Sequence, residues 1–403
     1  MKVLIADKLD ASCIQELKDA GCEVIFDPAL KEDALVRAVR DSHCRVLVVR
    51  STKVTADVFE AGDQLGVVVR AGAGVNTIDL DAASRRSVLV ANCPGKNAVA
   101  VAELTFGLML ALDRRIVENT VDLKNGVWNK KLYSEARGLK GRTLGILGLG
   151  AIGRAVAERA KAFGMNVVAW SRSLTPETAE ALDIRCADSP RDVAGQCDIL
   201  TIHVAAAPET KNLVDADVLA ALKPGSSVIN TARADVLDYD ALAKAVREKQ
   251  LRVALDVYPN EPAATDKTFP DNFLQQDGIL YGTHHIGAST EQAQQAIARE
   301  TVSIVKEYAR TGRVRNCVNL QQESIARYVL IVRHLNRPGV LAHTLNAVSH
   351  AGINVEEMEN VICAGAESAC AQIKLDGPLD EETLRKIRRH EHVIAVIHAP
   401  ARE

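Results

Sequence analysis

Three residues with complementary chemistry stand in the second half of the 403-residue sequence: Arg233, Glu261 and His285. Histidine titrates near neutral pH, so it is the natural base for the proton of a hydroxyl group. A carboxylate hydrogen-bonded to the imidazole fixes its tautomer, and an arginine can hold a carboxylate through two parallel hydrogen bonds. Together the three suit the oxidation of a secondary alcohol that carries a carboxylate, with a nicotinamide cofactor receiving the hydride.

A glycine motif supplies a site for such a cofactor. Gly148, Gly150 and Gly153 follow an apolar run at residues 144–147, and apolar residues then recur at helical spacing. In a strand–turn–helix of this kind, the first glycine permits the turn, the second lets a pyrophosphate approach the backbone, and the third allows close packing. A strand predicted at residues 166–170 completes a βαβ unit, and the end of this second strand is where such units bind the ribose of the cofactor. This context favours a dinucleotide site over a glycine turn used only for packing.

The residues before the glycine motif predict a parallel sheet. Short apolar strands alternate with amphipathic helices from residue 1 to about 95, which is typical of a sheet covered on both faces. Arg50 and Arg70 each follow a predicted strand, where ligands of such sheets bind, and a glycine turn at residues 71–74 comes next. Two arginines beside free N–H groups suit an anionic substrate. Each arginine could instead lie along the surface with its charge in solvent.

Residues 96–283 predict a second α/β unit. A long helix at residues 97–115 enters it, and a second helix is expected at 119–128, followed by the solvated pair Lys130 and Lys131. Four later strands each precede polar residues: His203, Arg233, Asp256 and the pair His284-His285. Functional groups that recur at strand ends fit the crevice of a doubly wound sheet.

The expected fold is α/β, with two doubly wound Rossmann-like domains and a small third domain. A helix capped by Ser/Thr at residues 289–290 runs to about 311 and passes back to the first domain, which is therefore discontinuous. The C-terminal order β-α-β-β-α-β is ferredoxin-like. The predicted boundaries are residues 1–95 with 284–315, residues 96–283, a linker at 316–327, and residues 328–403.

Composition excludes several classes of function. Hydrophobic residues make up 47% of the chain and charged residues 25%, the net charge is −3, and no apolar run reaches membrane-spanning length. This favours a globular protein with neither a nucleic-acid nor a membrane partner. Nine cysteines without C-x-x-C pairs predict reduced thiols and a cytoplasmic location. No metal site is expected, because the side chains of His284 and His285 diverge.

The motifs together resemble the D-isomer-specific 2-hydroxyacid dehydrogenase family over roughly residues 1–315. The resemblance rests on the glycine motif, Asp256-Val-x-x-x-Glu-Pro262 and His285-Ile-Gly-Ala-Ser-Thr290. It implies that Arg233 binds the substrate carboxylate and carbonyl, that His285 is the acid/base, that Glu261 orients His285, and that Asp256 holds the nicotinamide amide. The residues expected at the cofactor are Ala73, Gly148, Gly150, Ala151, Ile152, Gly153, Ser171, Arg172, His203, Val204, Thr231, Ala232, Asp256, Gly287 and Ala288.

Within the family, residues 49–55 and 69–75 are most similar to the branch that oxidises D-3-phosphoglycerate on the route to serine. This implies that Arg50, Arg70, Gly72 and Gly74 contact the substrate. The C-terminal unit resembles an ACT domain, and the resemblance implies that His334, Asn336 and Asn354 hold a serine effector. These three residues could equally be a turn, a cap and an Asx bend. The family resemblance also implies a homodimer or homotetramer.

Departures from the family pattern leave the cofactor and the substrate open. NAD(H) is the family default, but Ser171-Arg172 stands where an acidic residue usually reads the ribose, so NADP(H) is a second possibility. Ala234 replaces a usual glycine, and His284 replaces a usual proline. The alternatives are an NADPH-dependent glyoxylate or hydroxypyruvate reductase, a dinucleotide-sensing corepressor, and an amino-acid sensor with a vestigial catalytic half. The intact set of arginine, glutamate and histidine argues against the corepressor.

Overall fold

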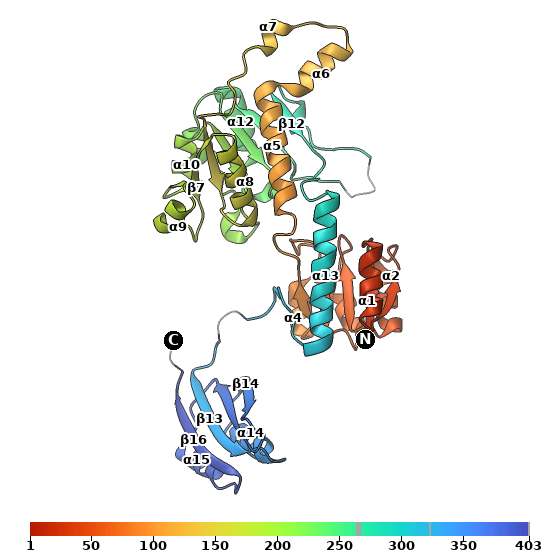
Figure 1. Ribbon diagram of the computed structural model, residues 1–403, viewed down its shortest axis with the longest axis vertical. Coiled ribbons are helices and arrows are strands. Elements are labelled where there is room, and N and C mark those ends of the chain that lie inside the picture. The colour runs from red at the N-terminus through yellow and green to blue at the C-terminus, as the bar shows by residue number, and fades with distance from the viewer. Residues whose placement is uncertain (263–266, 322–323, 402–403) are drawn as a thin grey trace. The chain divides into compact units, whose positions relative to one another are not determined.

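The computed structural model describes residues 1–262, 267–321 and 324–401. Contacts within the chain divide it into two compact units, residues 1–319 and residues 320–403 (Figure 1). The first unit contains two parallel sheets and the second contains one antiparallel sheet. The predicted fold class, two Rossmann-like lobes and a small ferredoxin-like domain, is confirmed. The predicted linker at 316–327 includes residues 322–323, which lie outside the described part.

The first lobe is built on a five-stranded sheet in the order β2-β1-β3-β4-β5, in which all strands are parallel. Its apolar strands are buried on both faces, as a parallel sheet between two helical layers requires. Helices α1 and α13 cover one face, and α2, α3 and α4 cover the other. The bounds are β1 (Lys2–Ile5), α1 (Ala11–Asp19), β2 (Glu23–Phe26), α2 (Glu32–Ser42), β3 (Val46–Val49), α3 (Ala56–Ala61), β4 (Val67–Arg70), α4 (Leu80–Arg85) and β5 (Leu89–Ala91).

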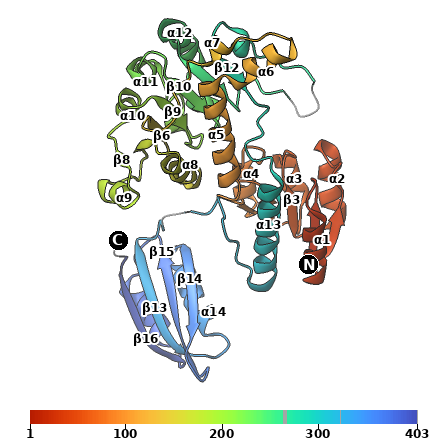
Figure 2. The same cartoon turned by 45° about the horizontal axis from the view of Figure 1, so that its top comes forward.

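The second lobe is a seven-stranded parallel sheet in the order β12-β11-β10-β9-β6-β7-β8 (Figure 2). This is the doubly wound order with one added strand, and the direction of winding reverses between β6 and β9. Its cores lie on both faces, one with α5 and α8 and one with α10, α11 and α12. The bounds are β6 (Thr143–Leu147), α8 (Ala151–Ala162), β7 (Asn166–Trp170), α9 (Pro176–Ala181), β8 (Arg185–Cys186), α10 (Pro190–Gln196), β9 (Ile199–Ile202), α11 (Ala216–Ala221), β10 (Ser227–Asn230), α12 (Tyr239–Lys249), β11 (Arg252–Leu255) and β12 (Leu280–Gly282).

Two long helices connect the lobes. Helix α5 (Ala98–Arg114) leaves the first lobe and packs on the second. Helix α13 (Glu291–Thr311) begins at Thr290, whose hydroxyl accepts the N–H of Ala293, and returns to the first lobe. The predicted cap is therefore present. The chain crosses between the lobes at both ends of the motif-bearing segment, which brings the carboxyl ends of both sheets toward one region.

A helical arm between α5 and β6 differs from the prediction. Arg115 adopts a left-handed conformation that ends α5, and α6 (Ile116–Lys124) starts immediately, whereas the sequence predicted a helix at 119–128. Lys130 and Lys131 are exposed, as expected, but they open a short helix, α7 (Lys130–Tyr133). No residue of α6 is buried, so no packing against a core determines where this helix begins and ends.

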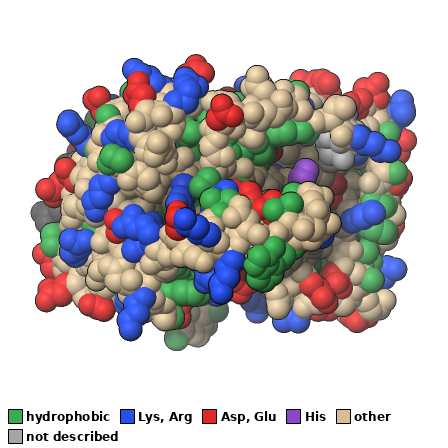
Figure 3. Space-filling view, turned by 90° about the horizontal axis from the view of Figure 1, so that it is seen from above, with side chains coloured by type: hydrophobic (Ala, Val, Ile, Leu, Met, Phe, Trp, Pro, Cys, Tyr) green, Lys and Arg blue, Asp and Glu red, His purple; other side chains and the backbone are tan. Residues whose placement is uncertain are grey.

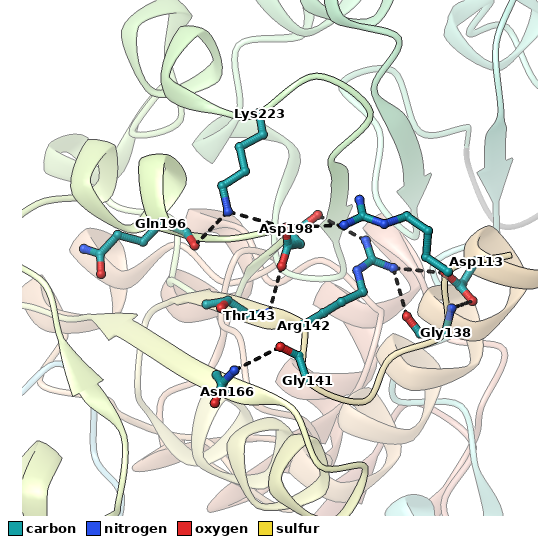
Figure 4. A network of polar contacts seen from close by, with 10 residues as sticks. Asp113, Gly138, Gly141, Arg142, Thr143, Asn166, Gln196, Asp198 and Lys223 are labelled. Atoms are coloured by element: carbon teal, nitrogen blue, oxygen red, sulfur yellow. Dashed lines mark hydrogen bonds and ion pairs between the residues drawn. The ribbon is translucent and has the colours of Figure 1, made fainter.

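A buried ion pair joins the two ends of this arm, where the chain leaves α5 and where it enters β6. Arg142 donates to Asp113 at 3.0 Å, and the side chains are only 10% and 3% exposed. Asp113 also accepts the N–H of Gly138 at 3.0 Å, so the end of α5 and the chain returning to β6 share one carboxylate (Figure 4). Asp198 joins the same network, accepting from the N–H of Thr143 and from Lys223. The arm therefore leaves the lobe from a fixed base.

The second unit has the predicted β-α-β-β-α-β order and an antiparallel sheet ordered β14-β15-β13-β16. Apolar residues of β13 and β15 alternate inward against two helices, which gives this unit its own core. The bounds are β13 (Tyr328–Leu335), α14 (Val340–His350), β14 (Val355–Ile362), β15 (Ser368–Leu375), α15 (Glu381–Arg388) and β16 (Val393–Pro400). No helix in the described residues is long and apolar enough to cross a membrane.

Candidate active site

The histidine and glutamate singled out in the sequence are hydrogen-bonded. His285 Nδ1 lies 2.7 Å from Glu261 Oε2, and Glu261 Oε1 accepts the N–H of Tyr258. Partial burial raises the pKa of Glu261, but these two bonds and the charges of His285 and Arg233 outweigh burial, so the pKa is lowered overall. An ionised carboxylate that accepts from Nδ1 leaves Nε2 of the ring free for a substrate proton. With 45% of its side chain exposed, His285 is accessible to a ligand.

The loop that carries His285 is held by Asp256. This carboxylate is 1% exposed and accepts the N–H groups of Ile286 at 2.9 Å and Gly287 at 2.8 Å, together with the hydroxyl of Thr283. His285 itself has a φ of 52°, a left-handed conformation that is uncommon for a side chain with a Cβ. The bonds to Asp256 on either side of it fix that conformation. A β-carbon at Gly287 would come 3.0 Å from Asp256 Oδ2, so the loop passes close to the carboxylate.

Arg233 follows β10 and is oriented by its neighbours. The side chain of Asn230, fully buried, donates to the carbonyl of Arg233 and accepts the N–H of Ala232, which sets the turn. Arg233 Nη1 donates to the carbonyl of Ala232 at 2.6 Å. The charge of Arg233 contributes to the lowered pKa of Glu261, so the structure brings Arg233, Glu261 and His285 into one region.

Two further arginines face this region from the first lobe. Arg70 Nε donates to the carbonyl of Arg50 at 3.0 Å. Burial, and then the neighbouring charges of Arg233 and Arg50, lower the pKa of Arg70. Within the described residues, no carboxylate lies within ion-pair distance of Arg50, Arg70 or Arg233. Three guanidinium groups without counter-ions form a site for an anion with more than one negative group.

The glycine turn at residues 71–74 lies between these guanidinium groups. A β-carbon on Gly72 would be 2.0 Å from Arg70 Nη1, and one on Gly74 would be 2.9 Å from Arg233 Nη2. A β-carbon at either position would therefore displace an arginine guanidinium, Arg70 of the first lobe or Arg233 of the second. Asp7, whose carboxylate accepts the N–H groups of Arg50 and Thr52, fixes the loop after β3.

The glycine motif has the geometry that a dinucleotide needs. Gly148 has a φ of 93°, and a β-carbon there would strike the His203 carbonyl group. A β-carbon on Gly153 would lie 2.1 Å from the carbonyl oxygen of Gly148, so this glycine permits close strand–helix packing. Gly150 faces open space, and no side chain caps the N-terminus of α8 there. The first N–H groups of α8 are thus free for a pyrophosphate.

Several further predicted cofactor residues follow strands of the same sheet at their carboxyl ends. His203 directly follows β9; its Nε2 bonds to Thr201, while its buried Nδ1 has no partner in the described residues. Thr231 is buried and bonds to the hydroxyl of Thr105 on α5. At the end of β7, Ser171 is half-buried and Arg172 is exposed, without an acidic residue in that pair. The other predicted cofactor residues stay predictions: Ala151 and Ile152 are the first residues of α8, Val204 and Ala232 follow β9 and β10, Ala288 lies in the loop after β12, and Ala73 lies in the glycine turn of the first lobe.

The three predicted effector residues do not converge within one chain. His334 is 2% exposed and already bonded to the carbonyl of Leu335 and to Asn360, and Asn336 donates to the carbonyl of Ala366. Asn354 precedes Val355, which reaches the Tyr328 end of β13 through Leu375. That end is about 20 Å from His334 at the usual rise per strand residue. A single small ligand therefore cannot touch all three in one copy.

Sequence reasoning missed the residues that orient the site. Asp7, Asn92, Asn230 and the loop-holding bonds of Asp256 all act through backbone groups, often far away in the chain. Such bonds have no characteristic spacing in a sequence. Within the described residues, no group of three His, Cys, Asp or Glu is arranged to hold a metal ion.

Comparisons with known proteins agree with this geometry. Residues 106–287 match the family model for D-isomer specific 2-hydroxyacid dehydrogenase, NAD binding domain. The D-3-phosphoglycerate dehydrogenase of Haemophilus influenzae is 33% identical over 362 residues, which cover 88% of this chain and 87% of that protein. The one from Methanocaldococcus jannaschii is 37% identical over 343 residues, which cover 83% of this chain and 64% of that protein. The chain thus spans less than two thirds of the latter relative.

A solved structure has the same fold. The NAD⁺-bound 3-phosphoglycerate dehydrogenase of Entamoeba histolytica superposes with a TM-score of 0.65 and 27% identity, covering 79% of this chain and 99% of that chain. The chain belongs to the D-isomer specific 2-hydroxyacid dehydrogenase family. Its second lobe is the NAD-binding domain of that family.

Proposed function

We propose that the protein is a D-3-phosphoglycerate dehydrogenase, which interconverts D-3-phosphoglycerate and 3-phosphohydroxypyruvate as the first step towards serine. The single observation that carries this proposal is the cluster of Arg50, Arg70 and Arg233 without carboxylate partners around the glycine turn. The substrate has a carboxylate at one end and a phosphate at the other, so its charges match a cluster of three cations. The names of the relatives from Haemophilus influenzae and Methanocaldococcus jannaschii support the same activity.

Each residue of the site has a separate role in the proposed reaction. Arg233 holds the carboxylate and the C2 oxygen, while Arg70 and Arg50 hold the phosphate end. His285 takes the hydroxyl proton at Nε2 during oxidation and returns it during reduction, and Glu261 bonded at Nδ1 stabilises the imidazolium that forms. Asp256 keeps the His285 loop in place. The bound nicotinamide supplies the hydride chemistry at C2.

NAD(H) fits the glycine turn and the uncapped start of α8, and the family model supports it. NADP(H) is a specific alternative because Ser171 and Arg172 follow β7, where a carboxylate would repel a 2′-phosphate. Comparing kcat/KM for NADH and NADPH decides between them, and a Ser171→Asp variant tests the cause. A negligible rate with NADPH, together with unchanged cofactor choice in the variant, would remove the NADP(H) alternative.

The same pair of residues favours a second candidate, an NADPH-dependent glyoxylate or hydroxypyruvate reductase. The steady-state reduction of 3-phosphohydroxypyruvate and of glyoxylate separates the two candidates. We expect 3-phosphohydroxypyruvate to be preferred, and a strong preference for glyoxylate would overturn the main proposal. Negligible turnover on both 2-oxo acids would instead favour a dinucleotide-sensing corepressor, although the bonded pair of His285 and Glu261 argues for a working enzyme.

We also propose that residues 320–403 are an ACT-like regulatory domain and that the protein is a cytoplasmic homo-oligomer. The domain has its own core and the fold expected of such a module. The arm of α6 and α7 is drawn in Figure 1 beyond the end of α5. It supports self-association, because it carries exposed apolar residues and none that is buried. They are Ile116, Val117, Val121, Leu123, Val127, Trp128 and Leu132, and Trp128 is 78% exposed.

A further inference from the structure

The chain that leaves α13 returns to the open edge of the first sheet. Strand β5 is the last strand of that sheet, and Cys317 pairs with Ala91 in an antiparallel bridge. The N–H of Val318 donates to the carbonyl of Val90 at 2.8 Å. We call residues 316–319 the tether, because the second compact unit begins at the next residue. The tether bonds to backbone groups of β5 that would otherwise be free to pair with a strand of another chain.

One side chain fixes the tether in register. Asn319 accepts the N–H of Val90 at 2.8 Å, and its amide donates to the carbonyl of Val88 at 2.9 Å and to Ser84 at 3.2 Å. The three bonds join the tether both to β5 and to the end of α4. Loss of this side chain would therefore free the tether from the sheet without removing any residue from the sheet itself.

The other end of the tether is fixed by α13. Asn316 has a left-handed φ of 54°, and its side chain donates to Glu300 at 2.9 Å. Glu300 also forms an ion pair with Lys96 at 3.0 Å, and its side chain is 13% exposed. Lys96 belongs to the segment between β5 and α5. The carboxylate of Glu300 thus bonds both to the tether and to the segment that leads into the second lobe.

Asn92 connects the tether to the glycine turn. Its backbone N–H donates to the carbonyl of Asn316 at 3.3 Å, and its side-chain amide donates to the carbonyl of Ala73 at 2.5 Å. The next residue, Cys93, donates its N–H to the carbonyl of Gly72 at 2.9 Å. The turn held in this way is the one between the guanidinium groups of Arg70 and Arg233.

We propose that the tether, acting through Asn92, positions the glycine turn and thereby sets the affinity for the anionic substrate. The inference rests on the proposed function for the identity of that substrate. Neither Asn92 nor the tether touches the reacting atoms, so both are positioning elements. A consequence is that residues 320–403 are joined to the chain beside the strand that supports the substrate turn.

Two variants of the whole chain test the inference. Asn92→Ala removes the bond to Ala73, and Asn319→Ala frees the tether. We expect KM for 3-phosphohydroxypyruvate to rise about tenfold in the first variant and about threefold in the second, as the loss of neutral hydrogen bonds predicts. The kcat should stay within about twofold, since neither bond touches the reacting groups.

Asn166→Ala is the matched control. Its amide donates to the carbonyl of Gly141 at 3.0 Å, also at a glycine turn, but at the opposite end of the nucleotide-binding sheet. We expect this variant to keep the wild-type KM. Wild-type KM values in both test variants, or a fall in kcat without a rise in KM, would overturn the inference.

Amide hydrogen exchange separates the inference from the proposed function, because it needs no turnover. In Asn319→Ala, exchange should accelerate in peptides covering residues 71–76 as well as in those covering 88–93. If only residues 88–91 and the tether exchange faster, the inference fails whatever the activity. If residues 71–76 respond but the wild type does not reduce 3-phosphohydroxypyruvate, the inference stands and the proposed function fails.

Discussion

At the scale of single residues, His285, the proposed acid/base, depends on two carboxylates with different tasks. Glu261 bonds to the ring of His285, and Asp256 holds the backbone on the C-terminal side of it. The left-handed backbone of His285 is costly for a residue with a β-carbon, so the loop needs those bonds. Both carboxylates lie on the segment that follows β11, and a small shift of that segment would move the ring and its partner together.

His285→Ala should reduce kcat by about two orders of magnitude or more, the usual contribution of a positioned acid/base. Steady-state kinetics with 3-phosphohydroxypyruvate measures the loss. His284→Ala is the matched control, because its side chain is adjacent and exposed, and we expect its kcat to remain close to that of the wild type. Near-normal turnover of His285→Ala would remove the acid/base assignment.

Glu261→Gln should move the pH–rate profile to lower pH and reduce kcat/KM. The pKa of Glu261 is lowered overall, so the carboxylate is charged throughout the neutral range and stabilises the positive charge that arises when the ring takes the substrate proton. The side-chain amide of glutamine has the shape of the glutamate carboxylate but carries no charge. The measurement is kcat/KM between pH 5 and 10 for both proteins, and superimposable profiles would show that the pair is not coupled.

His203 should make the protein less stable in mild acid. Burial lowers the pKa of His203 from 6.5 to about 3. The unfolded state therefore binds the additional proton between those values, and the free energy of unfolding falls as the pH decreases, by at most about 1.4 kcal/mol per pH unit. Above pH 6.5 this contribution is fully present. Urea unfolding at several pH values should show a shallower dependence in His203→Gln, and identical slopes would contradict the assignment.

At the scale of elements, most strands of the two parallel sheets could be predicted from the sequence, because they are short apolar runs. Buried strands are apolar runs in the sequence, and a parallel sheet binds its ligands at the carboxyl ends of its strands. The sequence therefore predicts that Arg70, His203 and Asp256, which end or follow such strands, lie on the ligand side of the sheets. The bounds of α6 were wrong because none of its residues is buried. The support of the glycine turn by Asn92 was missed because it depends on bonds between segments that only the fold brings together.

Gly72→Ala tests the glycine turn as an element. The added methyl group would meet Arg70 Nη1 at 2.0 Å, so the guanidinium must move away from the anion site. We expect KM for 3-phosphohydroxypyruvate to rise about tenfold or more, in line with the loss of a charge-assisted hydrogen bond. Gly107→Ala on α5 is the control, since a β-carbon there meets nothing within 4 Å. Equal KM values in both variants would contradict the account of the turn.

At the scale of the whole molecule, two features bear on the proposed self-association: the helical arm and the distribution of surface charge. Lys and Arg side chains are interspersed with Asp and Glu on the face drawn in Figure 3, and the net charge of the chain is −3. The arm instead combines exposed apolar side chains with a rigid base at Asp113 and Arg142. A projecting apolar element on a fixed base is suited to a self-complementary interface.

Replacing Leu123 and Trp128 together by serine should shift the protein to a smaller assembly. Both side chains are more than half exposed in one chain, and each would bury apolar surface in a partner. Light scattering coupled to gel filtration measures the mass of the assembly. Phe26→Ser is the control, because Phe26 is 44% exposed on the first lobe, away from the arm. An unchanged mass in the double variant would exclude the arm as the interface.

The most direct test of the proposed activity compares 3-phosphohydroxypyruvate with hydroxypyruvate, which differs only by the phosphate. Three guanidinium groups with no carboxylate partner among the described residues predict that kcat/KM is larger for the phosphorylated substrate by about two orders of magnitude, as charge-assisted bonds allow. Arg50→Ala and Arg70→Ala should remove most of that preference and leave hydroxypyruvate reduction closer to the wild-type rate. Equal kcat/KM values for the two substrates in the wild type would contradict the account.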